Sequence, residues 1–142
     1  MTSGTQAPVL IFGGVGGIGE ALARRLRTAG QSVAITSRSA ERVQALAAEI
    51  GATALVCDVL DEASIAAAYS SAAIDGHLNG LVYAVGSIPL KPLTRTTAED
   101  MIAAYQVNVV GAMALTRTDG ASSAARLKVR PSTAPFAAPI AT

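Results

Sequence analysis

Five glycines within the heptapeptide GGVGGIG at positions 13–19 form the pattern in this chain best suited to binding a phosphate group. An apolar run precedes them, and an Ala/Leu/Arg helical pattern follows directly. A strand that enters a helix through glycines directs backbone N–H groups and the positive end of the helix at one spot. That spot suits a phosphate or pyrophosphate, although a tight turn without a ligand is the other reading. The glycines fit two registers: G-x-G-x-x-G at Gly14, Gly16 and Gly19, or G-x-x-x-G-x-G at Gly13, Gly17 and Gly19.

Ser37 and Arg38 stand at the position that distinguishes the two nicotinamide cofactors. A site for NAD carries Asp or Glu about 20 residues after the glycines, where the carboxylate accepts from the ribose 2′-hydroxyl. This chain has no carboxylate between Glu20 and Glu41. A guanidinium binds phosphate oxygens in pairs, so an arginine flanked by hydroxyls suits a 2′-phosphate. We therefore predict NADP(H) rather than NAD(H), with an exposed surface arginine as the alternative for Arg38.

Apolar runs alternate with helical patterns through most of the chain, which predicts right-handed βαβ units and a parallel sheet. Ser39, Asp61 and either Thr96 or Thr97 are the expected helix caps. The fourth apolar run is expected to be a strand buried on both faces. The predicted strands are 8–12, 32–36, 53–56 and 80–85, and the predicted helices are 17–29, 40–50, 62–73 and 98–116.

Composition limits the classes of protein to which the chain can belong. Its 142 residues allow one ordinary domain, and its net charge of +1 favours neither nucleic acid nor a membrane surface as a partner. No apolar run reaches the roughly 18 residues of a membrane span, and MTSGTQAP is not typical of a signal peptide. The single cysteine, Cys57, is expected to be a buried strand-end residue and fits a reducing compartment, so we expect a cytoplasmic protein. No cluster of metal-ligating residues is apparent, so no metal is expected.

Residues 9–116 resemble the N-terminal half of a short-chain dehydrogenase/reductase, a family of oxidoreductases. The resemblance rests on the glycine turn at 13–19, SR at 37–38, CDV at 57–59, YAVG at 83–86 and NVVG at 108–111. It implies an incomplete Rossmann-like, doubly wound α/β fold with strand order 3-2-1-4 and the later strands missing. The first 116 residues would form the dinucleotide-binding domain.

The resemblance also implies roles for individual residues. Asn108 would match an asparagine that supports a catalytic proton relay, although it could instead simply bond backbone within a helix. Asp58 and Val59 would meet the adenine, with a helix cap as the alternative for Asp58. The remaining implied contacts are Gly13, Gly17, Ile18 and Gly19 beneath the pyrophosphate, and Ala84 and Gly86 beside the ribose.

The sequence departs from the family at several positions. Phe12 replaces the usual Thr before the first glycine, and Tyr83-Ala84-Val85-Gly86 replaces Asn-Asn-Ala-Gly. The family's chemistry needs a Ser and a Tyr-x-x-x-Lys pair, in which the lysine lowers the tyrosine's pKa for proton transfer. No Tyr-x-x-x-Lys occurs in these 142 residues, and His77 is expected to be a turn residue. We expect cofactor binding without turnover. The alternatives are a non-enzymatic NADP(H)-binding or sensing module and a non-functional remnant.

The fourth strand would form an edge of such a sheet. An unpaired apolar edge invites pairing with another chain, so low stability and self-association through an exposed strand or helix are expected.

Residues 117–142 lack any hydrophobic period and contain three of the six prolines, which predicts an irregular tail. Their composition suggests a frameshift or a cut gene after about residue 116. Translation of the downstream DNA in the other two frames is expected to yield a Ser followed by Tyr-x-x-x-Lys. Finding neither motif would refute the hypothesis of a frameshift or a cut gene.

Overall fold

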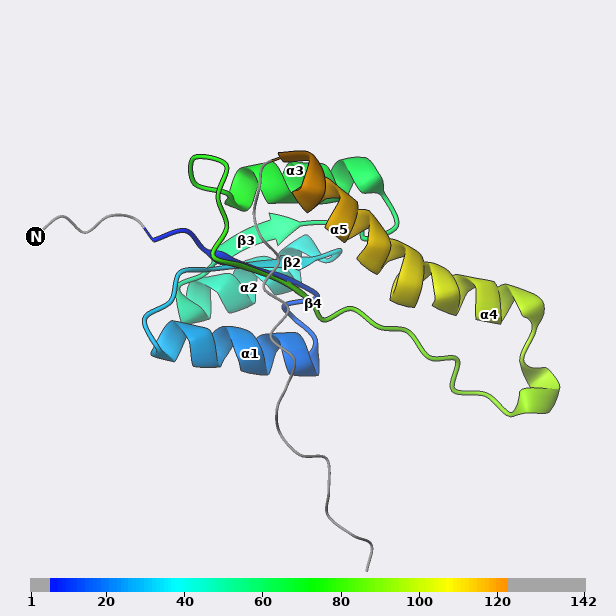
Figure 1. Ribbon diagram of the computed structural model, residues 1–142. Coiled ribbons are helices and arrows are strands. Elements are labelled where there is room, and N and C mark those ends of the chain that lie inside the picture. Colours follow the sequence, from blue (N-terminus) through cyan, green and yellow to red (C-terminus); the bar gives the residue numbers. More distant parts are fainter. Residues whose placement is uncertain (1–5, 123–142) are drawn as a thin grey trace, which may run out of the picture.

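Four parallel strands form one sheet between two layers of helices in the computed structural model, which describes residues 6–122 (Figure 1). The sheet order is β3-β2-β1-β4, which confirms the predicted Rossmann-like order. The strands are β1 (Val9–Phe12), β2 (Val33–Ser37), β3 (Thr53–Val56) and β4 (Gly80–Tyr83). The helices are α1 (Gly17–Thr28), α2 (Ala40–Ile50), α3 (Glu62–Ala72), the short η1 (Leu93–Arg95), α4 (Ala98–Tyr105), the π-helical η2 (Gln106–Val110) and α5 (Gly111–Ser122).

Strand β1 lies at the centre of the core and contributes side chains to both faces of the sheet. Because successive side chains of a strand point to opposite faces, Leu10 and Phe12 join one apolar cluster while Val9 and Ile11 join the other. Helices α3 and α5 cover the first cluster, and α1 and α2 cover the second (Figure 1). Each fully buried aliphatic side chain stabilises the fold by about 1.5–3 kcal/mol relative to exposure. Burial of β1 on both faces therefore fixes the strand that leads into the glycine turn.

Helix capping follows the sequence prediction. The side chain of Ser39 accepts from the backbone N–H of Arg42 at the start of α2, and that of Asp61 accepts from Ala63 at the start of α3. Of the two threonines considered for the next helix, Thr97 is the cap.

Strand β4 differs from the prediction in length and burial. It ends at Tyr83, two residues earlier than expected, and all four of its residues are only half-buried. The expectation that it is buried on both faces is wrong, because within residues 6–122 no strand lies on its outer side.

The long C-terminal helix is interrupted and extends further than predicted. The five residues of η2 are π-helical, and α5 continues to Ser122, past the expected end at Thr116. The other residues of the predicted tail lie outside the described part of the chain.

Large apolar side chains are exposed along the connection that follows β4 and along α4. Leu90 is 95% exposed and Leu93 is 89% exposed, and Met101, Ile102 and Tyr105 are each 57% exposed. Self-association through these surfaces stays a prediction. None of the helices in the described residues has the length and apolarity that a membrane span requires.

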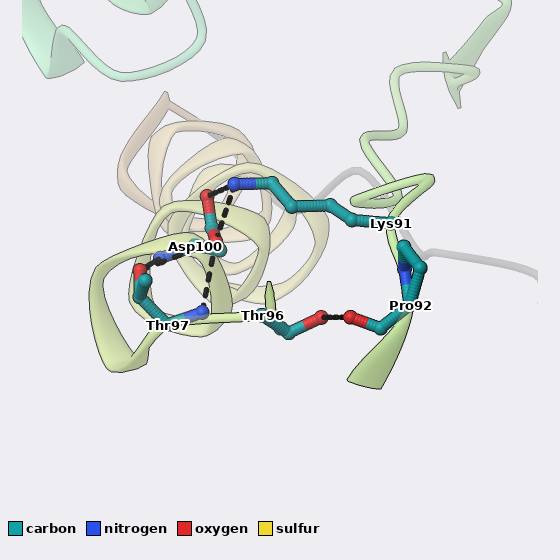
Figure 2. A network of polar contacts seen from close by, with 5 residues as sticks. All are labelled: Lys91, Pro92, Thr96, Thr97 and Asp100. Carbon is teal, nitrogen blue, oxygen red and sulfur yellow. Dashed lines mark hydrogen bonds and ion pairs between the residues drawn. The ribbon is translucent and has the colours of Figure 1, made fainter. Parts of the chain in front are cut away.

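A network of polar contacts fixes the start of α4 against the connection from β4 (Figure 2). The ammonium of Lys91 donates to both carboxylate oxygens of Asp100, at 2.7 and 2.6 Å. Thr97 and Asp100 form a reciprocal capping box, in which each side chain accepts from the other's backbone N–H. The hydroxyl of Thr96 donates to the carbonyl of Pro92 at 3.1 Å. These contacts hold the pKa of Asp100 below its ordinary value, chiefly through Lys91.

Acid is expected to loosen the first turn of α4 through Asp100. Because the pKa of Asp100 is lower in the folded state, its stabilisation is present above the ordinary aspartate pKa of about 3.9 and is lost as the pH falls through the lower folded value. The protection factors of the amides in that turn, in which the intrinsic pH dependence of hydrogen exchange is divided out, measure the loss. Asp100→Asn should abolish the pH dependence of these protection factors, whereas Asp61→Asn, which alters the cap of α3, should retain it. Protection factors in wild type that are unchanged between pH 5 and pH 2 would contradict this role.

Candidate functional site

A cleft of about 450 Å³ lies at the carboxyl ends of the strands, bounded by the loops that follow all four of them. In an open parallel sheet, ligands bind in the crevice outside these ends, where the strand order reverses. That reversal falls between β1 and β4 here. The cleft brings together seven of the residues predicted from sequence: Gly13, Ser37, Arg38, Asp58, Val59, Ala84 and Gly86.

Close backbone contacts shape the glycine turn. Gly13 has a φ of +79°, and a Cβ at this position would lie 2.7 Å from the carbonyl oxygen of Ala84. A Cβ on Gly19 would collide with the carbonyl of Gly13, so α1 packs directly on the turn. The register that includes Gly13 thus contains the residue with left-handed backbone. Gly14, from the other register, packs against β2, where a Cβ would lie 2.5 Å from the Cβ of Ile35.

The amino end of α1 emerges from this turn. Gly16 precedes the helix and offers no side-chain cap. The N–H groups of the first turn, at the positive end of the helix dipole, are therefore available to another acceptor. Gly17 has open space around its Cα, and Ile18 is 80% exposed. The predicted residues Gly17, Ile18 and Gly19 form this helix start rather than the wall of the cleft.

Two arginines stand at the end of β2. Arg38 follows the strand and is exposed, and Arg42 in the first turn of α2 also lines the cleft. The guanidinium of Arg42 donates to the carbonyl of Val15 in the glycine turn at 3.2 Å. The hydroxyl of Ser37 accepts from the backbone N–H of Ser39 at 3.1 Å, which orders the corner between strand and helix. This end of the cleft therefore carries positive charge.

The end of β3 supplies a carboxylate and a buried thiol. A carboxylate oxygen of Asp58 accepts from the backbone N–H of Leu60 at 3.0 Å, while the backbone N–H of Asp58 donates to the hydroxyl of Ser64 at 3.1 Å. Asp61, not Asp58, is the helix cap, which removes the alternative reading of Asp58. Cys57 is 2% exposed, as expected, and burial raises the pKa of its thiol.

Asn108 clamps the loop that follows β4. Its side-chain oxygen accepts from the backbone N–H of Ser87 at 2.9 Å, and its side-chain nitrogen donates to the carbonyl of Ser87 at 2.7 Å. The asparagine thus bonds the backbone of another segment rather than of its own helix. Ser87 and Val107 line the cleft, whereas Asn108 does not.

Several lining residues escaped the sequence prediction. Arg42 had a usable signal, because it lies in the first turn of a helix that begins just after Arg38. Val107 and Ser87 had none, because their place in the cleft depends on how η2 packs against the loop after β4. The lining residues Val15, Gly16, Cys57 and Val85 lie within motifs identified from the sequence, and Gly16 belongs to the first glycine register, but they were not among the predicted cofactor contacts. Thr36 and Leu60 complete the lining and were not predicted.

None of the lysine, tyrosine or histidine side chains of residues 6–122 lines the cleft. Lys91, the one lysine among residues 6–122, is bound to Asp100 outside the cleft. Burial raises the pKa of the Tyr83 phenol, whose hydroxyl donates to the carbonyl of Val107. His77 lies in the turn before β4, at the amino ends of the strands. Over the same residues, no three His, Cys, Asp or Glu side chains gather as a metal ion would require.

Comparisons with known proteins match the sequence and the fold to one family. The family model described as short chain dehydrogenase matches residues 7–120. Carbonyl reductase family member 4 from Xenopus laevis is 38% identical over 105 residues, which cover 71% of this chain and 44% of that protein. The 3-oxoacyl-(acyl-carrier-protein) reductase of Bos taurus is 36% identical over 106 residues, covering 72% of this chain and 45% of that protein.

A solved structure agrees in fold. The short-chain type dehydrogenase/reductase from Mycobacterium ulcerans superimposes with a TM-score of 0.74 at 26% identity, over 82% of this chain and 46% of that chain. The chain therefore spans less than half the length of these relatives. Its glycine turn, its strand order and a family match that covers most of its residues lead to one conclusion: the chain belongs to the short chain dehydrogenase family.

Proposed function

We propose that this chain is the NADP(H)-binding portion of a short-chain dehydrogenase/reductase-type oxidoreductase and that it binds the cofactor without turning over a substrate. The observation that carries the proposal is the pair Arg38 and Arg42 beside Ser37 at the end of β2. Two guanidinium groups favour a phosphate dianion, whereas a bare ribose hydroxyl would favour a carboxylate at this place.

In this proposal, the parts of the cofactor follow one another along the order of the strands. The adenosine would lie across the ends of β3 and β2, with Asp58 and Val59 beside the adenine and the 2′-phosphate on Ser37, Arg38 and Arg42. The pyrophosphate would lie on the turn at 13–19 and the amino end of α1. The remaining nicotinamide ribose would then extend past Ala84 and Gly86 towards Ser87.

A bound NADP(H) supplies hydride transfer to or from a carbonyl or alcohol carbon in this family. The relatives' names include a carbonyl reductase and a 3-oxoacyl reductase, so we propose a carbonyl or alcohol as the substrate class of the complete protein. This chain's residues bind and orient the cofactor, and Asn108 supports the loop on which the reacting end would rest. A cytoplasmic location accords with the single buried thiol of Cys57.

Arg38→Ala and Arg42→Ala are each expected to weaken NADPH binding about tenfold or more, because each removes a charge-assisted contact to the 2′-phosphate. In Arg38→Ala, NADH affinity should stay unchanged, since NADH lacks that phosphate. Arg42→Ala also removes the contact to Val15 in the glycine turn, so it should weaken NADH as well, by less than it weakens NADPH. Fluorescence titration of the folded chain measures both constants. Arg25→Ala, which removes an exposed arginine from α1 outside the cleft, serves as the matched control. Wild-type protein that binds NADH as tightly as NADPH, or binds neither, would refute the proposal.

The chain alone is expected to show no turnover. With saturating NADPH and a panel of aldehydes, ketones and 3-oxoacyl thioesters, the nicotinamide absorbance should fall no faster than in protein-free buffer, because no Tyr-x-x-x-Lys is present to donate a proton. Binding is measured in the same sample, so that inactivity is distinguished from failure to bind. Protein-dependent consumption of NADPH would show that another residue supplies the proton.

A further inference from the structure

The carbonyl of Val107 has an unusual partner because the helix around it is π-helical. The backbone N–H of Gly111 donates to the carbonyl of Gln106, five residues back. In an α-helix the same N–H would donate to Val107, four residues back. The carbonyl of Val107 instead accepts from the side-chain hydroxyl of Tyr83, at the end of β4. Short π-helical segments are rare and occur frequently at functional sites.

Gly111 leaves the space that the Tyr83 hydroxyl occupies. A Cβ at position 111 would lie 2.5 Å from that hydroxyl oxygen and 3.1 Å from the carbonyl oxygen of Val59. The phenol is half-buried, and burial raises its pKa, so it stays protonated and remains a donor. The strand end, the loop after β3 and the π-helical segment therefore meet at one tyrosine.

The next residue along the helix is the clamp residue Asn108. Its two bonds to Ser87 require η2 to keep its rotation about the helix axis. If the Tyr83 hydroxyl were absent, Val107 would regain the Gly111 N–H as its α-helical donor. A backbone hydrogen bond to the carbonyl four rather than five residues back would rotate this segment about the helix axis. The rotation would carry the side chain of Asn108 away from Ser87.

We propose that Tyr83 is a positioning residue that holds the π-helical segment in place, so that Asn108 fixes Ser87 at the β4 end of the cleft. Tyr83 does not itself line the cleft; it acts on bound ligand through Val107 and Asn108. The proposal rests on the proposed NADP(H) function and deepens it, because it assigns the ordering of the nicotinamide half of the cleft to a residue outside that cleft.

Tyr83→Phe tests the proposal with two ligands and one spectroscopic signal. NADPH reaches from the arginine end to Ser87, whereas adenosine 2′,5′-bisphosphate occupies only the arginine end. The variant is expected to bind NADPH about threefold to tenfold more weakly, the effect of one lost hydrogen bond, and the bisphosphate within twofold of wild type. In the ligand-free protein, the side-chain amide resonance of Asn108 should move towards the position of a solvated amide.

Two further variants sharpen the test. Tyr105→Phe removes a hydroxyl from the exposed tyrosine of α4 and should change none of the three readouts. Gly111→Ala should weaken NADPH binding and move the Asn108 resonance, because its methyl group displaces the Tyr83 hydroxyl. That methyl group would also lie 3.1 Å from the carbonyl oxygen of Val59, so the split between the two ligands is tested with Tyr83→Phe alone. Thermal unfolding of each variant is measured in parallel, and Tyr83→Phe decides the matter if Gly111→Ala does not fold.

Each outcome of the Tyr83→Phe experiment decides for or against the proposal. Weakened NADPH binding with an unchanged bisphosphate and a shifted Asn108 resonance supports it. Parallel weakening of both ligands indicates a general structural role and overturns it, as does an unmoved Asn108 resonance. If wild-type protein binds neither ligand, the proposed function fails, and the Asn108 resonance in the ligand-free protein still decides whether Tyr83 positions the clamp.

Discussion

The contact between Gly13, Gly19 and Ala84 is the constraint on which the rest of the site depends. Three backbone segments, from the end of β1, the start of α1 and the end of β4, approach so closely that no side chain fits between them. The approach brings the positive end of α1 against the turn without an intervening Cβ. It also fixes the position of the end of β4 relative to β1, and thereby the position of the loop that carries Ser87. A phosphate site and the wall beside it thus follow from a single packing requirement.

Burial of β1 on both faces keeps that contact in place. The strand lies between β2 and β4, and its side chains enter both apolar clusters, so the glycine turn follows a strand that is buried on both faces. The neighbouring strand β2 ends at Ser37, and Arg38 and Arg42 follow it, on the side of the turn away from β4. Charge therefore lies at one end of the cleft and uncharged backbone at the other. An extended ligand with a phosphate at one end would meet both in the correct order.

Local sequence signals identified most of this arrangement. Ser39 and Asp61 were predictable as caps, because each has a side-chain acceptor placed directly before a helical pattern. Gly13 and Arg38 follow predicted strand ends, and strand ends of a parallel sheet share one edge. Asp58 and Gly86 were implied by the family resemblance rather than by a local signal.

The π-helical turn was not predictable. The apolar pattern of residues 107–110 (VNVV) is the same whether each backbone N–H donates to the carbonyl four or five residues back. The half-burial of β4 depends on what lies beside it, which its own apolar residues do not reveal. The clamp by Asn108 depends on tertiary packing between segments 21 residues apart.

The same packing gives Tyr83 and Lys91 separate hydrogen-bond partners. Tyr83 is the last residue of the edge strand β4. Its hydroxyl already donates to the carbonyl of Val107, and the pKa of its phenol is raised by burial rather than lowered by a neighbouring cation. Lys91, the cation that would lower such a pKa, is held by Asp100 at the start of α4. Bringing the two together would break the ion pair between Lys91 and Asp100 and the hydrogen bond from Tyr83 to Val107. In residues 6–122, the contacts that hold α4 and the π-helical segment therefore engage Tyr83 and Lys91 separately.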